Sequence, residues 1–447
     1  MVGRARADRT RGSTSEGPGP RRVRTGVLRG CAKDTRPLYS PRPDLNTTSL
    51  TEQVLSQADA LAKCSEAGDR LTRRALTAAM KQAHEMLGQW CQQSGFEVRC
   101  DAAGNLRATS GWGDGRALLC GSHLDTIIGA GKYDGMLGVL LMLAAVQHTG
   151  PLPYPVEIVA FSDEEGVRFR RPYFGSRALA SSWQPSDLKL VDAGGVSLEQ
   201  ALIDFGLDPA ELGDAAVSSQ RYFAFFEPHI EQGPVLESRR APLGVVTAIC
   251  AQRWVELSFS GRAGHAGTTP MDLRRDALAG AAEVIVGAER LARDEAGLLV
   301  TAGRIECSPN VGNAVPGECK ISLDLRCRED RALEQAQAQL LQLAERAAEE
   351  RSLTLGYETL ASEPAVGCDI TLRKCLTESL VAKGYPAHEL MSGAGHDARM
   401  LAAKLPVAML FLRSPEGLSH HPGERVLPED VGAAIEVIAE FLSRLKP

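Results

Sequence analysis

Four short apolar runs, each with the length and composition of a buried β-strand, constrain the fold of this chain more than any other feature. Each run leads into a polar cluster that contains His, Asp or Glu. In open α/β sheets, ligands bind at the carboxyl ends of the strands. Four such clusters at one sheet edge predict a single convergent site with the composition of a metal centre. The runs and their clusters are 116–120 with 121–125, 156–161 with 162–166, 222–226 with 227–233, and 407–412 with 419–424.

The order of strands and helices predicts an α/β protein with an inserted domain. A length of 447 residues exceeds one ordinary hydrophobic core, which also favours two domains. We expect a mostly parallel sheet with helices on both faces, formed by the discontinuous segments 49–245 and 362–447. Between them, 246–361 has the order β-α-β-β-α-β of a ferredoxin-like α+β domain. Further expected elements are a helix over 71–94, a hairpin over 96–110 and a closing helix over 429–446.

Charge, hydropathy and cysteine usage exclude several function classes. The net charge of −6 gives no reason to expect a nucleic-acid partner. No uncharged apolar stretch reaches the ~18 residues that a membrane span needs, so no membrane partner is expected. The eleven cysteines are scattered without a CxxC pair. This favours reduced thiols in a cytoplasmic protein over a disulfide scaffold or a Cys-type zinc site.

Residues 1–48 differ in composition from the rest of the chain. They carry ten Arg and one Lys against four acids, with Gly, Ser and Pro throughout. Such a segment cannot bury enough apolar area to fold, and it lacks the apolar core of a secretory signal. We expect a disordered basic tail or an upstream start that is not used; a transit peptide is the alternative because the segment is Arg-rich and acid-poor.

The polar clusters supply ligands that suit zinc and similar ions. His123 and His229 each follow a strand, and Asp134 lies in the turn before a helix. His420 supplies a late ligand from beyond the last strand of the sheet. Imidazole nitrogen and carboxylate oxygen are the donors that such ions prefer. Each residue alone has a simpler explanation, a surface histidine or a turn aspartate, so the metal interpretation depends on their coincidence at one edge.

The adjacent acids Glu164 and Glu165 fit a two-metal site. Their side chains cannot both point the same way from an extended backbone, so one can bind metal while the other faces the reactive water. Two ions ~3.5–4 Å apart need a bridging carboxylate and activate one water between them. The simpler explanation of such a pair is that both glutamates are solvated surface residues. The chain has no GxSxG, no P-loop and no GxGxxG after a strand, so no rival catalytic set is as good.

At these residues the chain resembles the amidase branch of the dinuclear-metal aminoacylase and carboxypeptidase-G-like hydrolases. That branch contains allantoate amidohydrolase, N-carbamoyl-L-amino-acid hydrolase and β-ureidopropionase. HIEQGP and the GHAGTTPM segment separate it from the peptidases of the superfamily. The matching segments are GSHLDT (121–126), AGKYDGMLGV (130–139), FSDEEGVRF (161–169), HIEQGPVLE (229–237), GRAGHAGTTPM (261–271), PNVGNAVPGE (309–318), SGAGHDA (392–398) and LSHHPGE (418–424).

The resemblance implies a metal-dependent catalytic domain made of 49–245 and 362–447. Asp134 would bridge two divalent metal ions, zinc or else manganese or cobalt. Glu164 would be the general base. The pattern Ser-His-x-Pro-x-Glu selects His420 rather than His421 as a ligand. The implied metal ligands are His123, Asp134, Glu165, His229 and His420.

The resemblance also implies a substrate site that two subunits share. In relatives the inserted domain, here 246–361, forms a dimer interface and a lid. His265 would reach the active site of the other subunit in a homodimer, bind substrate and stabilise the oxyanion. Arg326 would grip a substrate carboxylate, although without the resemblance a surface salt bridge would be expected there. The implied substrate-binding residues are Gln232, His265, Asn313, Arg326 and Gly395.

The implied activity is hydrolysis of a linear ureido or carbamoyl C–N bond in a small carboxylate-bearing molecule. The segments AGKYDG and SDEEGVRF favour allantoate, which would yield ureidoglycine, ammonia and carbon dioxide. N-carbamoyl-L-amino-acid hydrolase or β-ureidopropionase is the close alternative; an aminoacylase, a dipeptidase or a non-catalytic homologue is a more distant one. The chain departs from the family at Pro228, at Cys250-Ala251 and at Arg399, and we expect Arg399 to affect specificity more than activity.

Overall fold

A nine-stranded mixed sheet dominates the computed structural model, which describes residues 46–111 and 115–447. Its strand order is β1-β2-β4-β3-β5-β15-β6-β13, with β14 also paired to β6. The central strands β4, β3, β5 and β15 are parallel, as expected, while β1, β2 and β13 pair antiparallel at the margins. The strands are β1 (Glu97–Cys100), β2 (Leu106–Thr109), β3 (Ala117–His123), β4 (Val156–Phe161), β5 (Tyr222–Ile230), β6 (Leu243–Ile249), β13 (Val366–Gly367), β14 (Glu389–Ser392) and β15 (Val407–Leu412).

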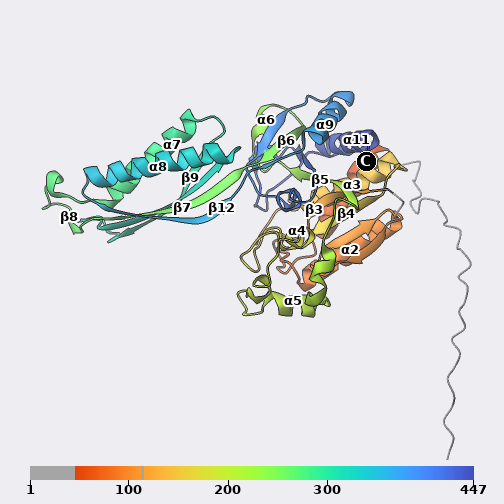
Figure 1. Ribbon diagram of the computed structural model, residues 1–447, viewed down its shortest axis with the longest axis horizontal. Helices are drawn as coiled ribbons and strands as arrows, with labels where there is room; N and C mark the ends of the chain where they lie inside the picture. The colour runs from red at the N-terminus through yellow and green to blue at the C-terminus, as the bar shows by residue number, and fades with distance from the viewer. Residues whose placement is uncertain (1–45, 112–114) are drawn as a thin grey trace, which may run out of the picture. The chain divides into compact units, whose positions relative to one another are not determined.

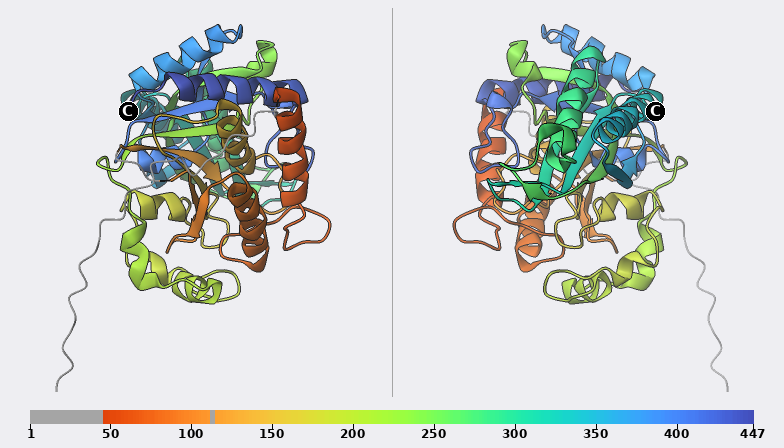
Figure 2. Two further views of the ribbon diagram at one scale, coloured as in Figure 1. Left: turned by 90° about the vertical axis from the view of Figure 1, so that its right-hand side faces the viewer. Right: turned by 90° about the vertical axis from the view of Figure 1, so that its left-hand side faces the viewer.

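Successive side chains of the central strands enter two different hydrophobic cores, because side chains alternate between the faces of a strand. In β4, Ile158 and Ala160 face one core, whereas Val159 and Phe161 face the other. Both faces are therefore covered by helices, as Figure 2 shows. The first core receives α1 (Thr47–Leu61), α2 (Ala78–Gln93), α3 (Met136–Thr149), α9 (Ile370–Ala382) and α11 (Pro428–Arg444). The second receives α4 (Phe174–Leu179), α5 (Leu198–Phe205), η2 (Pro209–Ala215), α6 (Val235–Ser238) and α10 (Asp397–Leu401).

Local capping explains where single elements begin. The helix expected over 71–94 is shorter, because Thr77 lies in an extended conformation and its hydroxyl accepts a hydrogen bond from Met80 N at 3.3 Å, which starts α2 at Ala78. The hairpin expected over 96–110 is confirmed by the antiparallel pairing of β1 and β2. Gly104 adopts a φ of +81° in its turn, a conformation that favours glycine.

Residues 251–363 form a second, four-stranded antiparallel sheet with the order β12-β7-β11-β9. The elements follow one another as β-α-β-β-α-β, and the two helices share a separate hydrophobic core with the sheet (Figure 1). The domain limits and a dimerising role for this segment stay predictions. The main elements are β7 (Ala251–Ser260), α7 (Ala277–Asp294), β9 (Leu299–Ser308), β11 (Glu318–Cys327), α8 (Asp330–Glu350) and β12 (Thr354–Glu363), with a small sheet of β8 (Gly264–His265) and β10 (Ala314–Val315).

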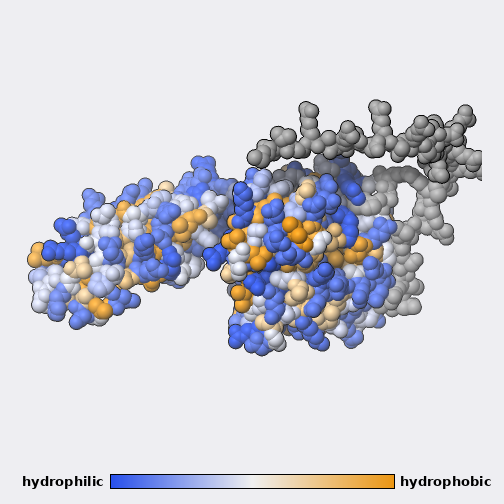
Figure 3. Space-filling model, turned by 90° about the horizontal axis from the view of Figure 1, so that it is seen from below, coloured by the Kyte–Doolittle hydropathy of each residue, from blue (hydrophilic) through white to orange (hydrophobic). Residues whose placement is uncertain are grey.

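The predicted disordered tail, 1–48, lies outside the described residues except for its last three. There, Asn46 Oδ1 accepts a hydrogen bond from Ser49 N at 2.9 Å and caps α1. Across the described ranges, no helix combines the length and the apolar character that crossing a bilayer would take. The face drawn in Figure 3 is a mosaic of hydrophilic and hydrophobic residues.

Candidate metal centre

The carboxyl edge of the parallel strands brings the predicted ligands together. His123 is the last residue of β3, and His229 lies within β5, opposite Phe411 of β15. Both were expected just beyond their strands, but the ladder hydrogen bonds continue further than the apolar runs do. Asp134 lies in the turn before α3, and His420 follows the short 3-10 helix η4 (Pro415–Gly417). Residues that are far apart in sequence therefore converge at one edge.

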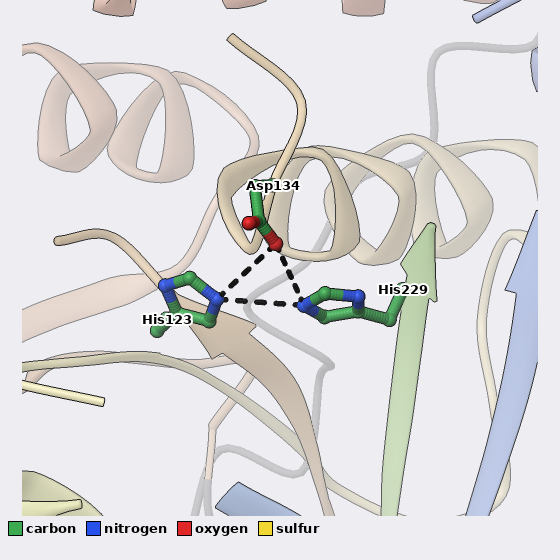
Figure 4. Close-up of side chains that lie close together, drawn as sticks. All are labelled: His123, Asp134 and His229. Carbon is green, nitrogen blue, oxygen red and sulfur yellow. Dashed lines mark hydrogen bonds and ion pairs between the residues drawn. The ribbon is translucent and has the colours of Figure 1, made fainter. Parts of the chain in front are cut away.

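One cluster consists of His123, Asp134 and His229, all at most 3% exposed (Figure 4). Asp134 Oδ1 lies 3.7 Å from His123 Nε2 and 3.3 Å from His229 Nε2. The two Nε2 atoms are 3.4 Å apart. Three donor atoms thus surround one point, each with a lone pair available to a cation.

A second cluster shares Asp134 with the first. His420 Nε2 lies 3.1 Å from Asp134 Oδ2 and 3.3 Å from Glu165 Oε1. The Asp134 carboxylate therefore presents Oδ1 to one cluster and Oδ2 to the other, which is the geometry of a bridging ligand. His420 is the exposed member, with 48% of its side chain accessible, so this cluster opens toward solvent.

Backbone carbonyls orient the two buried imidazoles. His123 Nδ1 lies 2.9 Å from Asp125 O, and His229 Nδ1 lies 2.9 Å from Ile230 O. A carbonyl can only accept, so Nδ1 of each ring carries the proton and Nε2 presents its lone pair to the cluster. Gly135 lies against the His123 ring, where a Cβ would come within 2.4 Å of the imidazole atoms, and its φ of +67° also favours glycine.

Asp125 holds the pair of adjacent glutamates. Its Oδ1 accepts a hydrogen bond from Glu164 N at 2.9 Å, and its Oδ2 accepts one from Glu165 N at 3.1 Å. Glu164 is 8% exposed, and its Oε2 lies 4.0 Å from His123 Nε2. Glu165 Oε1 also lies close to His420 Nε2. The expectation that the two acids point apart is not met, because the backbone bends at 164–165 and His123, Glu164 and Glu165 bring one ligand atom each within 4.8 Å of one another.

Glu424 holds the turn that carries Asp134. Its Oε1 accepts hydrogen bonds from Tyr133 N at 2.8 Å and from Asp134 N at 3.0 Å, and its Oε2 accepts one from Ser419 Oγ at 3.2 Å. Glu424 is 4% exposed. It lies in the motif LSHHPGE, but sequence reasoning assigned it no role, because nothing local indicates a contact with residues almost three hundred positions away.

The electrostatics of the site suit a divalent cation. Burial raises the pKa of the Glu164 carboxyl well above its ordinary value. Burial, with the negative charge of Asp134, also raises the pKa of Glu424 to about 7. Among the described residues, no Lys or Arg forms an ion pair with Asp134, Glu164 or Glu165. Without a Lys or Arg partner, these carboxylates have only the neighbouring histidines to compensate their charge, and a bound metal ion would take over that role.

Gln232 lies beside the Asp134 carboxylate. Its Nε2 donates to Asp134 Oδ2 at 3.1 Å and to Ser419 Oγ at 3.3 Å. Its Oε1 is buried and accepts no hydrogen bond from any described residue. The residue expected to bind substrate thus lies directly beside the shared carboxylate, with an amide oxygen left to accept a further donor.

Arg326 contacts the segment that contains Gly395. Arg326 Nη2 donates to Asp324 Oδ2 at 2.7 Å, and its Nη1 donates to the carbonyl oxygen of Gly393. The ion pair with Asp324 is the one expected without any family resemblance, with both side chains about a quarter exposed. Tyr173, which sequence reasoning missed, has its phenol oxygen 1.7 Å from where a Cβ on Gly395 would lie, so Gly395 makes room for this ring.

His265 lies in β8 of the small sheet, and Asn313 lies in the turn directly before β10. His265 pairs with Ala314, and Ala266 N donates to Asn313 O at 2.9 Å. Both His265 and Asn313 are exposed. Over the described part of the chain, neither forms a hydrogen bond or ion pair with the metal cluster. The structure therefore groups the expected substrate residues into separate sets and does not unite them within one chain.

Comparisons with known proteins place the chain in a hydrolase family. A model of the peptidase family M20/M25/M40 matches residues 121–444. The N-carbamoyl-L-amino acid amidohydrolase of Geobacillus stearothermophilus is 38% identical over 374 residues, which cover 82% of this chain and 91% of that protein. The allantoate deiminase of Arabidopsis thaliana is 36% identical over 439 residues, covering 89% of this chain and 83% of that protein.

A solved structure has the same fold. The crystal structure of an amidase of the hydantoinase/carbamoylase family from Burkholderia multivorans matches with a TM-score of 0.83 at 31% sequence identity. The match covers 88% of this chain and 97% of that one.

Proposed function

Because the chain belongs to the peptidase family M20/M25/M40, we propose that it is a metal-dependent amidohydrolase acting on the ureido C–N bond of a small carboxylate-bearing molecule. The observation that carries this proposal is the shared Asp134 carboxylate, whose two oxygens face separate groups of metal-binding side chains. The names of the two relatives, an N-carbamoyl amino acid amidohydrolase and an allantoate deiminase, support the same bond as the target.

We assign the metal ligands as two sets that share one residue. His123, His229 and Asp134 form the buried set, and Asp134, Glu165 and His420 form the open set. Zinc, manganese and cobalt all suit these nitrogen and oxygen donors. Two such ions would lower the pKa of a water molecule and would polarise the carbonyl that this water attacks.

Glu164 is the general base in this proposal. Its carboxylate is buried beside His123 and lies close enough to His123 and Glu165 to form a third group of possible ligands, but we leave it out of both sets so that it can accept a proton. It accepts a proton from the attacking water and delivers it to the leaving nitrogen. Asp125 fixes the backbone of Glu164 through a hydrogen bond of 2.9 Å, which keeps the carboxylate aimed while the proton moves.

Arg326 is the proposed contact for the substrate carboxylate. The guanidinium makes a planar fork that matches a carboxylate, and Asp324 already occupies such a contact. A substrate carboxylate would take over or share the donors that Asp324 now uses. Gly395 and Gln232 complete the proposed binding surface, and His265 with Asn313 would come from a second copy of the chain.

Allantoate is the first substrate that we propose, and N-carbamoyl-L-amino acids are the second. The segments AGKYDG and SDEEGVRF support the first, and the Geobacillus stearothermophilus relative supports the second. The test is ammonia release from allantoate and from a panel of N-carbamoyl amino acids, measured for protein loaded separately with zinc, manganese and cobalt. Dipeptides and N-acetyl amino acids serve as controls. Faster cleavage of these controls than of every ureido compound would contradict the proposal.

The homodimer with a shared active site has its own test. His265→Ala and Glu164→Gln are each expected to be nearly inactive as pure proteins. In a mixed dimer, one site combines the intact Glu164 of one subunit with the intact His265 of the other. Mixing the two variants under conditions that exchange subunits should therefore restore activity. A mixture that stays inactive, although mixed dimers are detected by mass spectrometry, contradicts the assignment of His265.

A further inference from the structure

Two cysteines lie directly opposite each other in the four-stranded sheet. Cys307 of β9 is the register partner of Cys319 of β11, and their sulfur atoms are 3.4 Å apart. Cys319 is 1% exposed, whereas Cys307 is half-buried. We propose that these two thiols are a reversible oxidation site, which a small hydroperoxide converts into a cross-strand disulfide.

The pairing distinguishes these thiols from the other cysteines. Of the ten free cysteines that the structure describes, this pair is the one whose sulfurs lie within hydrogen-bonding distance of each other. Cys100 is exposed and has a backbone carbonyl as its contact instead. An oxidised Cys307 would therefore meet a second thiol at once, whereas an oxidised Cys100 would have to find one on another molecule.

The geometry indicates a bond that forms with little movement of the two strands. The sulfurs must close from 3.4 Å to the ~2.05 Å of a disulfide. Opposed residues of an antiparallel pair have Cβ atoms ~4.5–5.5 Å apart, while a relaxed disulfide prefers ~3.5–4.5 Å. A small approach of the two strands would therefore bring the sulfur atoms into bonding distance.

The chemistry balances with one hydroperoxide per pair. The Cys307 thiolate attacks the peroxide, the O–O bond breaks, and Cys307 becomes a sulfenic acid while the alcohol leaves. The Cys319 sulfur then displaces the sulfenic oxygen, which departs as water with the remaining thiol proton. The two thiols lose two electrons and the peroxide gains them. Burial raises the pKa of Cys319 to about 12, so the more accessible Cys307 is the thiol that reacts first.

The pair brackets the loop that carries one of the proposed substrate residues. Residues 308–318 include Asn313, and Ala314 in this loop pairs with His265. A disulfide would restrain the base of this loop and so alter the positions of Asn313 and His265. This consequence depends on the proposed function, but the oxidation site itself does not.

Mass spectrometry tests the site without any activity assay. Cleavage after Arg304 and Lys320 places both cysteines in one tryptic peptide, 305–320. After brief treatment of the intact protein with hydrogen peroxide, this peptide should lose two hydrogen atoms in mass and resist alkylation. Dithiothreitol should restore both thiols. Cys100→Ser should behave like the natural chain, whereas Cys307→Ser and Cys319→Ser should lose the internal bond.

One result would overturn the oxidation site, and another would overturn its effect on the loop. If peroxide oxidises Cys100 while peptide 305–320 keeps two free thiols, the pair is not an oxidation site. If the disulfide forms but kcat/KM for the ureido substrate does not change, the link to the loop is wrong. We expect kcat/KM to fall by about tenfold and to recover with dithiothreitol, since ~1 Å displacements can cost up to ~100-fold in rate. In the Cys319→Ser enzyme the cross-strand bond cannot form, so kcat/KM should keep most of its value after the same peroxide treatment.

Discussion

Replacing Glu424 tests whether a residue outside the ligand set holds the metal centre together. Glu424 accepts hydrogen bonds from Tyr133 N and Asp134 N, and it is 4% exposed, so Glu424→Ala leaves two buried N–H groups without an acceptor. Each such loss costs ~1–3 kcal/mol, which predicts that the free energy of unfolding falls by about 2–6 kcal/mol. Metal affinity should also fall by ~10–100-fold, because the turn that aims Asp134 is no longer held.

Two assays test Glu424→Ala. The first is urea unfolding of the metal-depleted protein, and the second is the metal content of separately loaded protein after dialysis against a chelator. Glu424→Gln keeps one carbonyl oxygen that can accept both N–H groups, so its loss of stability should stay near ~1 kcal/mol. Glu378→Ala is the control, because Glu378 is half exposed and its ion pairs are long, at 4.0 Å. The reasoning is refuted if Glu424→Ala and Glu378→Ala unfold at the same urea concentration and retain the same amount of metal.

Three further predictions concern the base, the substrate contact and the pH dependence of stability. Glu164→Gln should keep its metal but lose ~10²–10⁴-fold in kcat, and substantial residual turnover would reject Glu164 as the base. Arg326→Ala should raise KM for carboxylate substrates by ~10–100-fold; an unchanged KM would show that Asp324 is the true partner of Arg326. Burial, with the charge of Arg73, lowers the pKa of His84 to about 4. The unfolded chain, with a His pKa near ~6.5, then binds more protons, so stability should fall by about 2 kcal/mol between about pH 7.5 and about pH 5. Denaturant unfolding of His84→Leu at about pH 7.5 and about pH 5 should lack the part of the fall in unfolding free energy that comes from His84.

Candidate metal ligands could be named from the sequence because their positions depend on local patterns, and the family resemblance then selected Glu165 and His420 among neighbouring candidates. Apolar runs mark the buried strands, and parallel strands end at a common edge, so His123 and His229 had to approach each other. The sequence did not predict that Glu164 and Glu165 would both reach the neighbourhood of His123, because the bend of the backbone at 164–165 is not visible in local periodicity. The β-α-β-β-α-β order of residues 251–363 was also visible, since helix and strand periodicities differ.

Only the tertiary structure decided how these residues are used. The two oxygens of Asp134 face separate clusters because folding brings His229 close to Oδ1 and His420 close to Oδ2. Glu424 supports a turn almost three hundred residues away, and Cys307 meets Cys319 through the register of two strands. Local periodicity predicts which face of an element is buried. Strand register and long-range contacts are determined only by the packing of the elements against one another.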